Sequence, residues 1–507
     1  MNIQEAKKEI YYTLQAYLRK DADGNYCFPT VRQRPILLMG PPGIGKTAIV
    51  EQAAQEQGIG LVCYTMTHHT RQSAVGLPKI VAREYDGVEV SVTEYTLSEM
   101  IASVYECMER TGSREGILFL DEINCVSETL SPTMLQFLQN KKFGSHKVPE
   151  GWVIVAAGNP PQYNKSVREF DIVTLDRVRR LDVEPDLDVW MTYAWEKEVH
   201  GAILSYLTLK KERFYQIRRN GEEKAFVTAR GWEDLSELLK NYEAIQAPCG
   251  LEVMRQYLQE EETAREFAAY YQLYEKYQAD YGIAEILDGS IEPGSAWYEE
   301  KVQMAGAAGF EERCMVINLL LDAVGQELAR FERIDEQAVL LQTALKQYLK
   351  QQEKQGKWQG LTAFAEKKRE QLQVKEQMGL ESWSSLQKEQ SVLRMLESYD
   401  LTLQMEHIRE KEAGMNRIRS LFQEGILRQR MELLKRCKVQ MSRMFAFAHQ
   451  SFSDAQEMIL LVSGLTKNAG AMRFICAHGC EEYMKYCDVL MPEDREKLLW
   501  ECSQIDV

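Results

Sequence analysis

The run GPPGIGKT, at residues 40–47, has the residue types and spacing needed to bind a chain of phosphate groups. Its glycines let backbone N–H groups curl around phosphate oxygens, and a helix starting directly after the loop adds favourable partial charge at its N-terminus. Lys46 is expected to reach the β- and γ-phosphates, and the Thr47 hydroxyl to bind Mg²⁺. An ordinary glycine-rich turn is the alternative. The strand pattern before the run and the helix pattern after it favour a phosphate loop.

A second run, ILFLDEIN at residues 117–124, places two acids at the end of an apolar strand. Ligands of open α/β sheets bind at the carboxyl ends of the strands. Asp121 is therefore expected to hold Mg²⁺ through water, while Glu122 polarises the attacking water. The alternative is a solvated acidic strand end. The residues predicted to bind nucleotide are Gly40, Pro41, Pro42, Gly43, Ile44, Gly45, Lys46, Thr47 and Asp121.

Three further polar residues are predicted to contribute to catalysis. Asn159, in AAGNP, follows another apolar strand and is expected to hydrogen-bond the γ-phosphate or the lytic water; alone, Asn-Pro is a turn initiator. Arg177, in LDRVRR, is a candidate arginine finger that acts on a neighbouring subunit, with Arg179 and Arg180 as weaker candidates. Arg230, in VTARGWEDL, is expected near a helix start, where it would clamp the phosphates. For each arginine, the alternative is an ordinary surface or interface position.

The elements that position these residues alternate between strands and helices in the first part of the chain. Continuous apolar runs at residues 36–39, 61–66, 116–120 and 152–158 are typical of a parallel sheet buried on both faces. Helical patterns between them, at residues 48–57 and 97–109, complete a doubly wound α/β arrangement. Around Asp86 and Gly87, KIVAREY and VEVSVTEY predict an inserted β-hairpin.

Beyond about residue 186, the patterns are helical at residues 190–207, 232–242 and 254–278. Pro293 and Gly294 mark a candidate boundary, after which long Gln/Glu/Lys-rich stretches predict exposed helices. The fold prediction is an α/β P-loop NTPase core at residues 1–185, with a parallel sheet flanked by helices. A helical lid at residues 186–290 and an all-α C-terminal region at residues 291–507 follow it.

The amino-acid composition argues against a nucleic-acid-binding, a secreted or a membrane-spanning protein. Hydrophobic residues at 45% and charged residues at 27% are typical of a soluble globular protein. A formal net charge of −15 disfavours a broad grip on nucleic acid. The start, MNIQEAKKEIYYTLQAYL, predicts an amphipathic helix rather than a secretory signal, and no apolar run is long enough to span a membrane. The eleven cysteines follow no framework spacing, which indicates reduced thiols and a cytoplasmic protein.

GPPGIGKT, ILFLDEIN, AAGNP, LDRVRR and VTARGW follow the order and spacing of AAA+ ATPases, and the chain resembles that family over residues 31–289. The DEIN ending, the hairpin at Asp86-Gly87 and KVPEGWVIVAAGNPPQYN resemble the MoxR-type branch. This resemblance implies a hexameric ring, ATP rather than GTP with Mg²⁺ between subunits, and a chaperone-like role. It also implies a von Willebrand factor A domain partner and a protein client. Val178 departs from the pattern, since the family's finger is usually followed by Phe.

Two other function classes stay open at this point. A nucleic-acid-associated NTPase motor would need a basic groove or pore, which the acidic balance disfavours. A slow nucleotide-dependent signalling switch would use the helical C-terminal part as a docking surface and would retain nucleotide with little turnover. The sequence does not identify the client or the role of residues 291–507.

Overall fold

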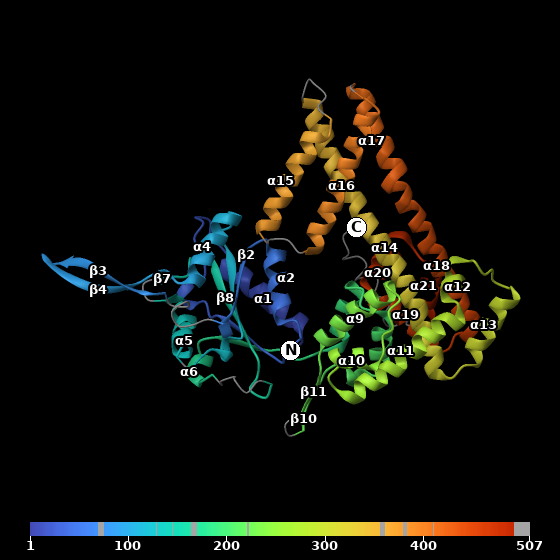
Figure 1. The fold of residues 1–507 in the computed structure, drawn as a ribbon, viewed down its shortest axis with the longest axis horizontal. Coiled ribbons are helices and arrows are strands. Elements are labelled where there is room, and N and C mark those ends of the chain that lie inside the picture. Colours follow the sequence, from blue (N-terminus) through green and yellow to red (C-terminus); the bar gives the residue numbers. More distant parts are fainter. Residues whose placement is uncertain are drawn as a thin grey trace. The chain divides into compact units, whose positions relative to one another are not determined.

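The computed structural model describes residues 1–68, 76–127, 129–143, 146–163, 170–220, 223–354, 360–378, 383–408 and 410–490. The chain forms two compact units (Figure 1). The first comprises Met1–Val189 together with Gln373–Leu386, and the second comprises Trp190–Leu372 together with Gln387–Val507. The division into three domains at residues 185 and 290 stays a prediction.

A five-stranded parallel sheet forms the centre of the first unit, with strand order β2–β5–β8–β1–β9. The predicted parallel α/β core is confirmed. One strand, β9, was not predicted, because RRLD is largely charged and only Leu181 in it is buried. The strands are β1 (Ile36–Met39), β2 (Gly60–Thr65), β5 (Gly116–Asp121), β8 (Trp152–Gly158) and β9 (Arg179–Asp182).

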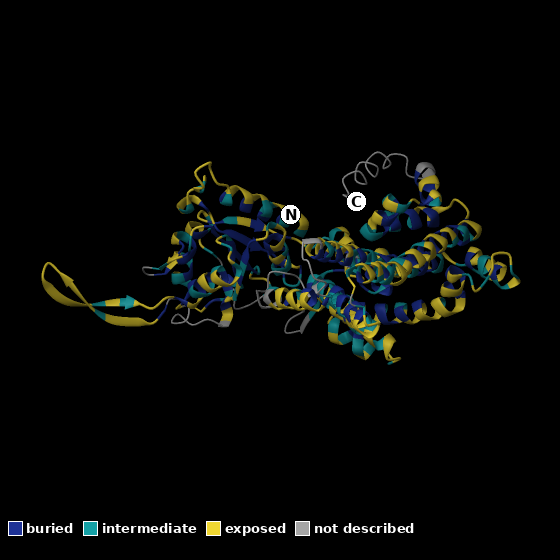
Figure 2. Cartoon of the chain, turned by 90° about the horizontal axis from the view of Figure 1, so that it is seen from above, coloured by how far each residue is buried: buried dark blue, intermediate teal, exposed yellow. Residues whose placement is uncertain are grey.

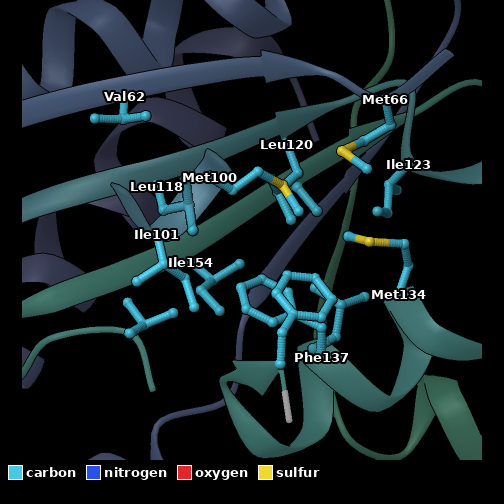
Figure 3. Packing of buried hydrophobic residues seen from close by; sticks show 14 of the residues in the cluster. Val62, Met66, Met100, Ile101, Leu118, Leu120, Ile123, Met134, Phe137 and Ile154 are labelled. Atoms are coloured by element: carbon cyan, nitrogen blue, oxygen red, sulfur yellow. The ribbon is translucent and has the colours of Figure 1, made fainter. Parts of the chain in front are cut away.

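Helices cover both faces of this sheet. Alternate residues of a strand point to opposite faces, so Leu118 and Leu120 pack on one side and Phe119 on the other, all fully buried. On the first side they contact Ile101 and Phe137 from the covering helices (Figure 3). The helices of the first unit are α1 (Ile3–Leu18), α2 (Lys46–Gln57), α4 (Glu99–Thr111), α5 (Ser131–Asn140) and α6 (Ile172–Leu175), with 3₁₀ turns η1 (Thr30–Arg32), η2 (Met66–His68) and η3 (Ile123–Cys125).

The predicted hairpin is confirmed and projects away from the sheet (Figures 1 and 2). It consists of β3 (Pro78–Tyr85) and β4 (Val88–Tyr95). Asp86 and Gly87 have φ values of 50° and 79°, which is the left-handed pair that a two-residue type I′ turn requires. Most of its side chains are exposed, including the apolar Ile80 (76%) and Val88 (61%). A second, minimal hairpin joins β6 (Lys142–Phe143) to β7 (His146–Lys147).

Among the described residues after β9, the regular structure is helical except for one hairpin that was not predicted, β10 (Gln216–Asn220) with β11 (Glu223–Val227). The stretch expected as one helix at residues 190–207 is two, since the helical pattern breaks before His200, which caps the second. The helices are α7 (Leu187–Glu196), α8 (Gly201–Leu209), α9 (Ala229–Ala244), α10 (Leu251–Tyr257), α11 (Glu261–Tyr281), α12 (Ile283–Asp288), α13 (Ala296–Ala307), α14 (Phe310–Lys354), α15 (Thr362–Met378), α16 (Trp383–Met405), α17 (Lys411–Phe422), α18 (Arg428–Phe452), α19 (Gln456–Lys467), α20 (Ala469–His478) and α21 (Glu481–Leu490).

Helix α14, 45 residues long, runs through the second unit. Near its start, Tyr281 of α11 donates a hydrogen bond to Glu312 (2.8 Å), and Tyr274 donates one to Asp322 (3.1 Å). Near its end, Leu341 is fully buried in a separate core formed with α15, α16 and α17. One helix is therefore held by α11 near its start and by the core of α15, α16 and α17 near its end.

The thiols partly follow the expectation from the sequence. Nine of the described cysteines are free thiols, whereas Cys476 is disulfide-bonded, so the expectation of reduced thiols throughout is wrong at that position. Among the described helices, none combines the length and the apolar character that a membrane crossing requires.

Candidate nucleotide-binding site

The loop GPPGIGKT connects β1, in the interior of the sheet, to α2. Helix α2 begins at Lys46, and Gly45 precedes it with φ at 90°, a left-handed conformation that favours glycine. The backbone therefore turns sharply and directs the N-terminus of α2 at the loop. Free N–H groups in the first turn of a helix form an anion site.

Lys46 is the most constrained side chain of the loop. It is 9% exposed, and its Nζ atom donates to the carbonyl oxygens of Gly40 and Pro41, each at 2.8 Å, and to Oδ1 of Asn159 at 2.9 Å. A buried ammonium requires such oxygen acceptors, because water no longer solvates it. Phosphate oxygens are acceptors of the same kind, so this position suits a phosphate-binding lysine.

Asp121, the last residue of β5, is held by both of its carboxylate oxygens. Oδ2 accepts a hydrogen bond from the Thr47 hydroxyl (3.1 Å), and Oδ1 accepts one from the backbone N–H of Glu122 (2.9 Å). A hydroxyl and a carboxylate oxygen thus lie together next to the phosphate loop. Hard oxygen donors of this kind are what Mg²⁺ selects, so Thr47 and Asp121 fit the predicted metal site.

Glu122 has a left-handed backbone, with φ at 54° and ψ at 38°. This conformation is uncommon for a residue with a side chain, and such outliers cluster at functional sites. The half-buried carboxylate forms no hydrogen bond or ion pair with any described residue. It is therefore available to a water molecule or a ligand.

Asn124 was not singled out from the sequence, although it ends the DEIN run. It is 3% exposed, and its amide donates to the backbone carbonyl of Asn159 (2.8 Å). Its Oδ1 atom is buried without a hydrogen-bond partner and lies against Gly158. Asn124 therefore fixes the segment that carries Asn159. The only hint in the sequence was its position two residues after the acidic pair.

Residues 36–176 match the model of the family described as ATPase family associated with various cellular activities (AAA). This segment is an AAA ATPase domain. The match starts at the first residue of β1 and includes the phosphate loop, both acids, Asn124 and Asn159. A search of curated proteins gave no significant match to the chain. The parallel sheet with its phosphate loop is the nucleotide-binding core of the AAA domain.

The three arginines near the end of the AAA domain have different environments. Arg177 is exposed, and its side chain forms no hydrogen bond or ion pair with the described residues. Arg179 is paired with Glu9 of α1, and Arg180 with Asp182 (2.7 Å). Two of the three finger candidates thus pair with residues of the same chain, whereas Arg177 has no such pair among the described residues.

The segment around Arg177 is held in place from both sides. Val178 is 4% exposed and belongs to the core that covers the sheet. Asp171 caps α6 by accepting a hydrogen bond from the Thr174 N–H (2.8 Å). Hydrogen bonds from Thr174 lower the pKa of Asp171, and the positive charge of Arg177 acts in the same direction. A valine anchors this position without the phenylalanine that the MoxR-type pattern has.

Arg230 lies in the second compact unit, in the first turn of α9. Thr228 caps this helix by accepting from the Gly231 N–H (3.2 Å), and Arg230 is exposed. Burial raises the pKa of the nearby Glu233, while the charge of Arg230 acts in the opposite direction. The predicted helix start is confirmed. The approach of Arg230 to the phosphates stays a prediction.

Proposed function

We propose that this chain is an ATP-hydrolysing ring ATPase of MoxR type that remodels or activates a protein client. The observation that carries the proposal is the convergence of Lys46, Thr47, Asp121 and Asn159 at the carboxyl ends of adjacent strands. Their hydrogen bonds join the phosphate loop to the acidic strand end. The AAA match over the same segment supports hydrolysis of a nucleoside triphosphate.

In the proposed reaction, the protein supplies positioning and charge, which provide nearly all the catalysis in phosphoryl transfer. Mg²⁺, held by Thr47 and by Asp121 through water, would neutralise phosphate charge when bound. Lys46 exchanges its carbonyl acceptors for β- and γ-phosphate oxygens. Glu122, whose carboxylate has no hydrogen-bond or ion-pair partner among the described residues, accepts a hydrogen bond from the attacking water and orients it.

Asn159 and the two arginines would complete the environment of the γ-phosphate. Asn159, released from Lys46, donates through its amide to the γ-phosphate or the water. Arg177 reaches the site from a neighbouring subunit, which is why we propose a ring, in keeping with the hexamers of the family it resembles. Arg230 clamps the phosphates from the lid and transmits the loss of the γ-phosphate to the second unit.

The MoxR-type assignment and the client role rest on two features. The hairpin β3–β4 is inserted between the η2 turn and α4 and presents exposed apolar side chains, including Ile80 and Tyr85 (55%). A projecting surface of this kind suits contact with a protein substrate. The residues of the KVPEGW and DEIN runs support the same branch. We also propose a von Willebrand factor A domain partner and a cytoplasmic location.

The test is co-purification with Glu122→Gln, which is expected to bind ATP and retain its client. Tagged full-length chains, wild-type and variant, are recovered from the native cell in the presence of ATP and compared by mass spectrometry. Enrichment of a protein with the Asp-x-Ser-x-Ser metal-adhesion motif supports the proposed partner. Wild-type turnover in Glu122→Gln would refute the role given to Glu122.

Two outcomes would instead favour the nucleic-acid motor or the signalling switch. Hydrolysis that is stimulated by nucleic acid, with retention on heparin, would favour a nucleic-acid motor. Wild-type turnover near zero, with nucleotide retained through purification, would favour a signalling switch.

A further inference from the structure

A cavity of about 290 Å³ lies in the second compact unit, remote in sequence from the AAA domain. It is bounded by the end of α12 and by one face of α18. Its volume is near the lower end of the range for small-molecule sites, so it can hold a small polar group. The lining residues are Leu287, Asp288, Lys435, Arg436, Val439, Gln440 and Arg443.

The lining from α18 is cationic, in a chain with a net charge of −15. Arg443 lies about two helical turns after Lys435 and Arg436, which are adjacent in sequence, and all three side chains line the cavity. Asp288 is the one acid in the lining, and hydrogen bonds from Ser290, the nearest at 2.7 Å, lower its pKa and keep it ionised. Positive charge therefore exceeds negative charge around the cavity.

The three cations differ in how far they are already neutralised. Arg436 forms an ion pair with Glu327 of α14 (2.8 Å). Arg443 donates one hydrogen bond to the backbone carbonyl of Leu287 (3.1 Å), which orients its guanidinium and leaves further N–H donors. Lys435 is exposed and has no ion pair with any described residue. Lys435 and Arg443 are thus the cations available to a ligand.

Gln440 adds a neutral polar side chain to the lining of the cavity. The residue is 8% exposed, yet its Oε1 atom is buried without any hydrogen-bond partner, and the side chain lines the cavity. A buried amide without a partner is unfavourable, so natural proteins rarely retain one without a reason. The Nε2 group of the same amide is not buried in this way and forms no hydrogen bond with a described residue, so it can donate to an acceptor in the cavity without any rotation.

We propose that this cavity binds a small oxyanion, a phosphate or a carboxylate, between Lys435, Arg443 and the amide of Gln440. Both groups accept charge-assisted hydrogen bonds from the two cations and a further one from the amide. The oxyanion neutralises the excess positive charge and accepts a hydrogen bond from the Nε2 group of Gln440. Free phosphate and the carboxylate of an acidic peptide are the two sources of this chemistry.

The test is calorimetric titration of the full-length chain with inorganic phosphate. The phosphate loop is first saturated with a non-hydrolysable ATP analogue and Mg²⁺, and sodium chloride keeps the ionic strength constant. Lys435→Gln and Gln440→Leu are each expected to weaken binding by about tenfold, since each removes one hydrogen bond to a charged group. A parallel titration with a short peptide rich in Asp identifies a carboxylate source if it binds more tightly than phosphate.

Arg428→Gln is the matched control, because it removes one charge from the same helix at a position outside the lining. It is expected to change the affinity by less than about twofold, as surface charges far from a site act weakly. Gln440→Leu is also expected to leave the melting temperature unchanged or higher, because it removes an unpaired buried amide. Equal binding by all variants, or no binding of either anion by the wild type, would overturn the proposal.

Discussion

The ammonium of Lys46 lies 2.9 Å from the side-chain oxygen of Asn159, and this hydrogen bond joins the phosphate loop to the end of strand β8. Its Nζ atom also donates to the backbone carbonyls of Gly40 and Pro41. A triphosphate that binds Lys46 competes with these acceptors, and Asn159 is the one that can rotate away. Nucleotide binding and the placement of Asn159 are therefore coupled.

Asn159→Ala and Asn159→Asp are expected to separate these two effects. The alanine variant loses a group near the γ-phosphate, so its hydrolysis rate should fall by roughly 10- to 100-fold with little loss of ATP affinity. The aspartate variant places a carboxylate beside Lys46, and ATP affinity should fall by at least about tenfold. Steady-state hydrolysis and titration with a fluorescent ATP analogue measure the two quantities. Equal ATP affinities in the two variants would contradict the coupling.

Gly158→Ala is expected to lower hydrolysis without unfolding the AAA domain. A Cβ atom at Gly158 would lie 2.6 Å from Oδ1 of Asn124, so Asn124 must move and the segment that it holds moves with it. Small displacements of catalytic groups cost up to about 100-fold in rate, and we expect a loss of at least tenfold. Gly309→Ala is the control, since a Cβ there meets nothing within 4 Å. A variant with wild-type turnover would show that Asn124 does not position Asn159.

Arg177→Ala should abolish most hydrolysis while ATP still binds, because its side chain forms no hydrogen bond or ion pair with the described residues and can act on a neighbouring subunit. Subunit mixing tests whether it acts on a neighbour. Arg177→Ala subunits retain Glu122, and Glu122→Gln subunits retain Arg177, so mixed rings should contain some complete sites and recover part of the activity. Arg180→Ala, whose side chain pairs with Asp182, is the control and should stay within about twofold of the wild type. Mixtures as inactive as the separate variants would exclude action between subunits.

The buried Lys141 should make the stability of the AAA domain depend on pH. Its ammonium donates to Gln33 (2.9 Å), and burial lowers its pKa from 10.5 to about 8. Below pH 8 the folded state bears the cost of a buried charge. Between pH 8 and 10.5 the folded chain releases a proton that the unfolded chain keeps, so stability from this group rises with pH.

Lys141→Met removes this dependence. The difference in free energy of unfolding between the variant and the wild type should therefore change by about 2 kcal/mol between pH 7 and 9.5, with the wild type gaining on the variant. Urea denaturation at each pH measures the difference. Lys142→Met, at the exposed neighbouring position, should show no comparable change. A pH-independent difference for Lys141→Met would rule out the lowered pKa.

The sheet and most of the site could be predicted because their determinants are local in the chain. Strands such as β5 are continuously apolar, and the phosphate loop and acidic pair each occupy a few consecutive residues. Strand β9 could not be predicted, because its largely charged residues carry no strand pattern. It forms through its backbone pairing with β1, which is distant in sequence. The role of Asn124 depends on a contact across 35 residues of sequence, which no local pattern encodes.

The environments of the arginines could not be predicted either. Sequence spacing gave Arg179 and Arg180 as alternatives to Arg177, and only the folded chain shows that Glu9 and Asp182 already pair with them. The cavity beside α18 likewise depends on the packing of α12 against a helix about 150 residues later in the chain.

The length of helix α14 determines how far one of its ends moves when the other end tilts. With 45 residues at about 1.5 Å each, it is a rod of roughly 65 Å, fastened at its first turns by the tyrosines of α11 and at its last turns by the outer helical bundle. A tilt of only about ten degrees at the near end would carry the far end through roughly 11 Å. A small rotation at the base of the extension would thus become a displacement of its far end by about two helical turns.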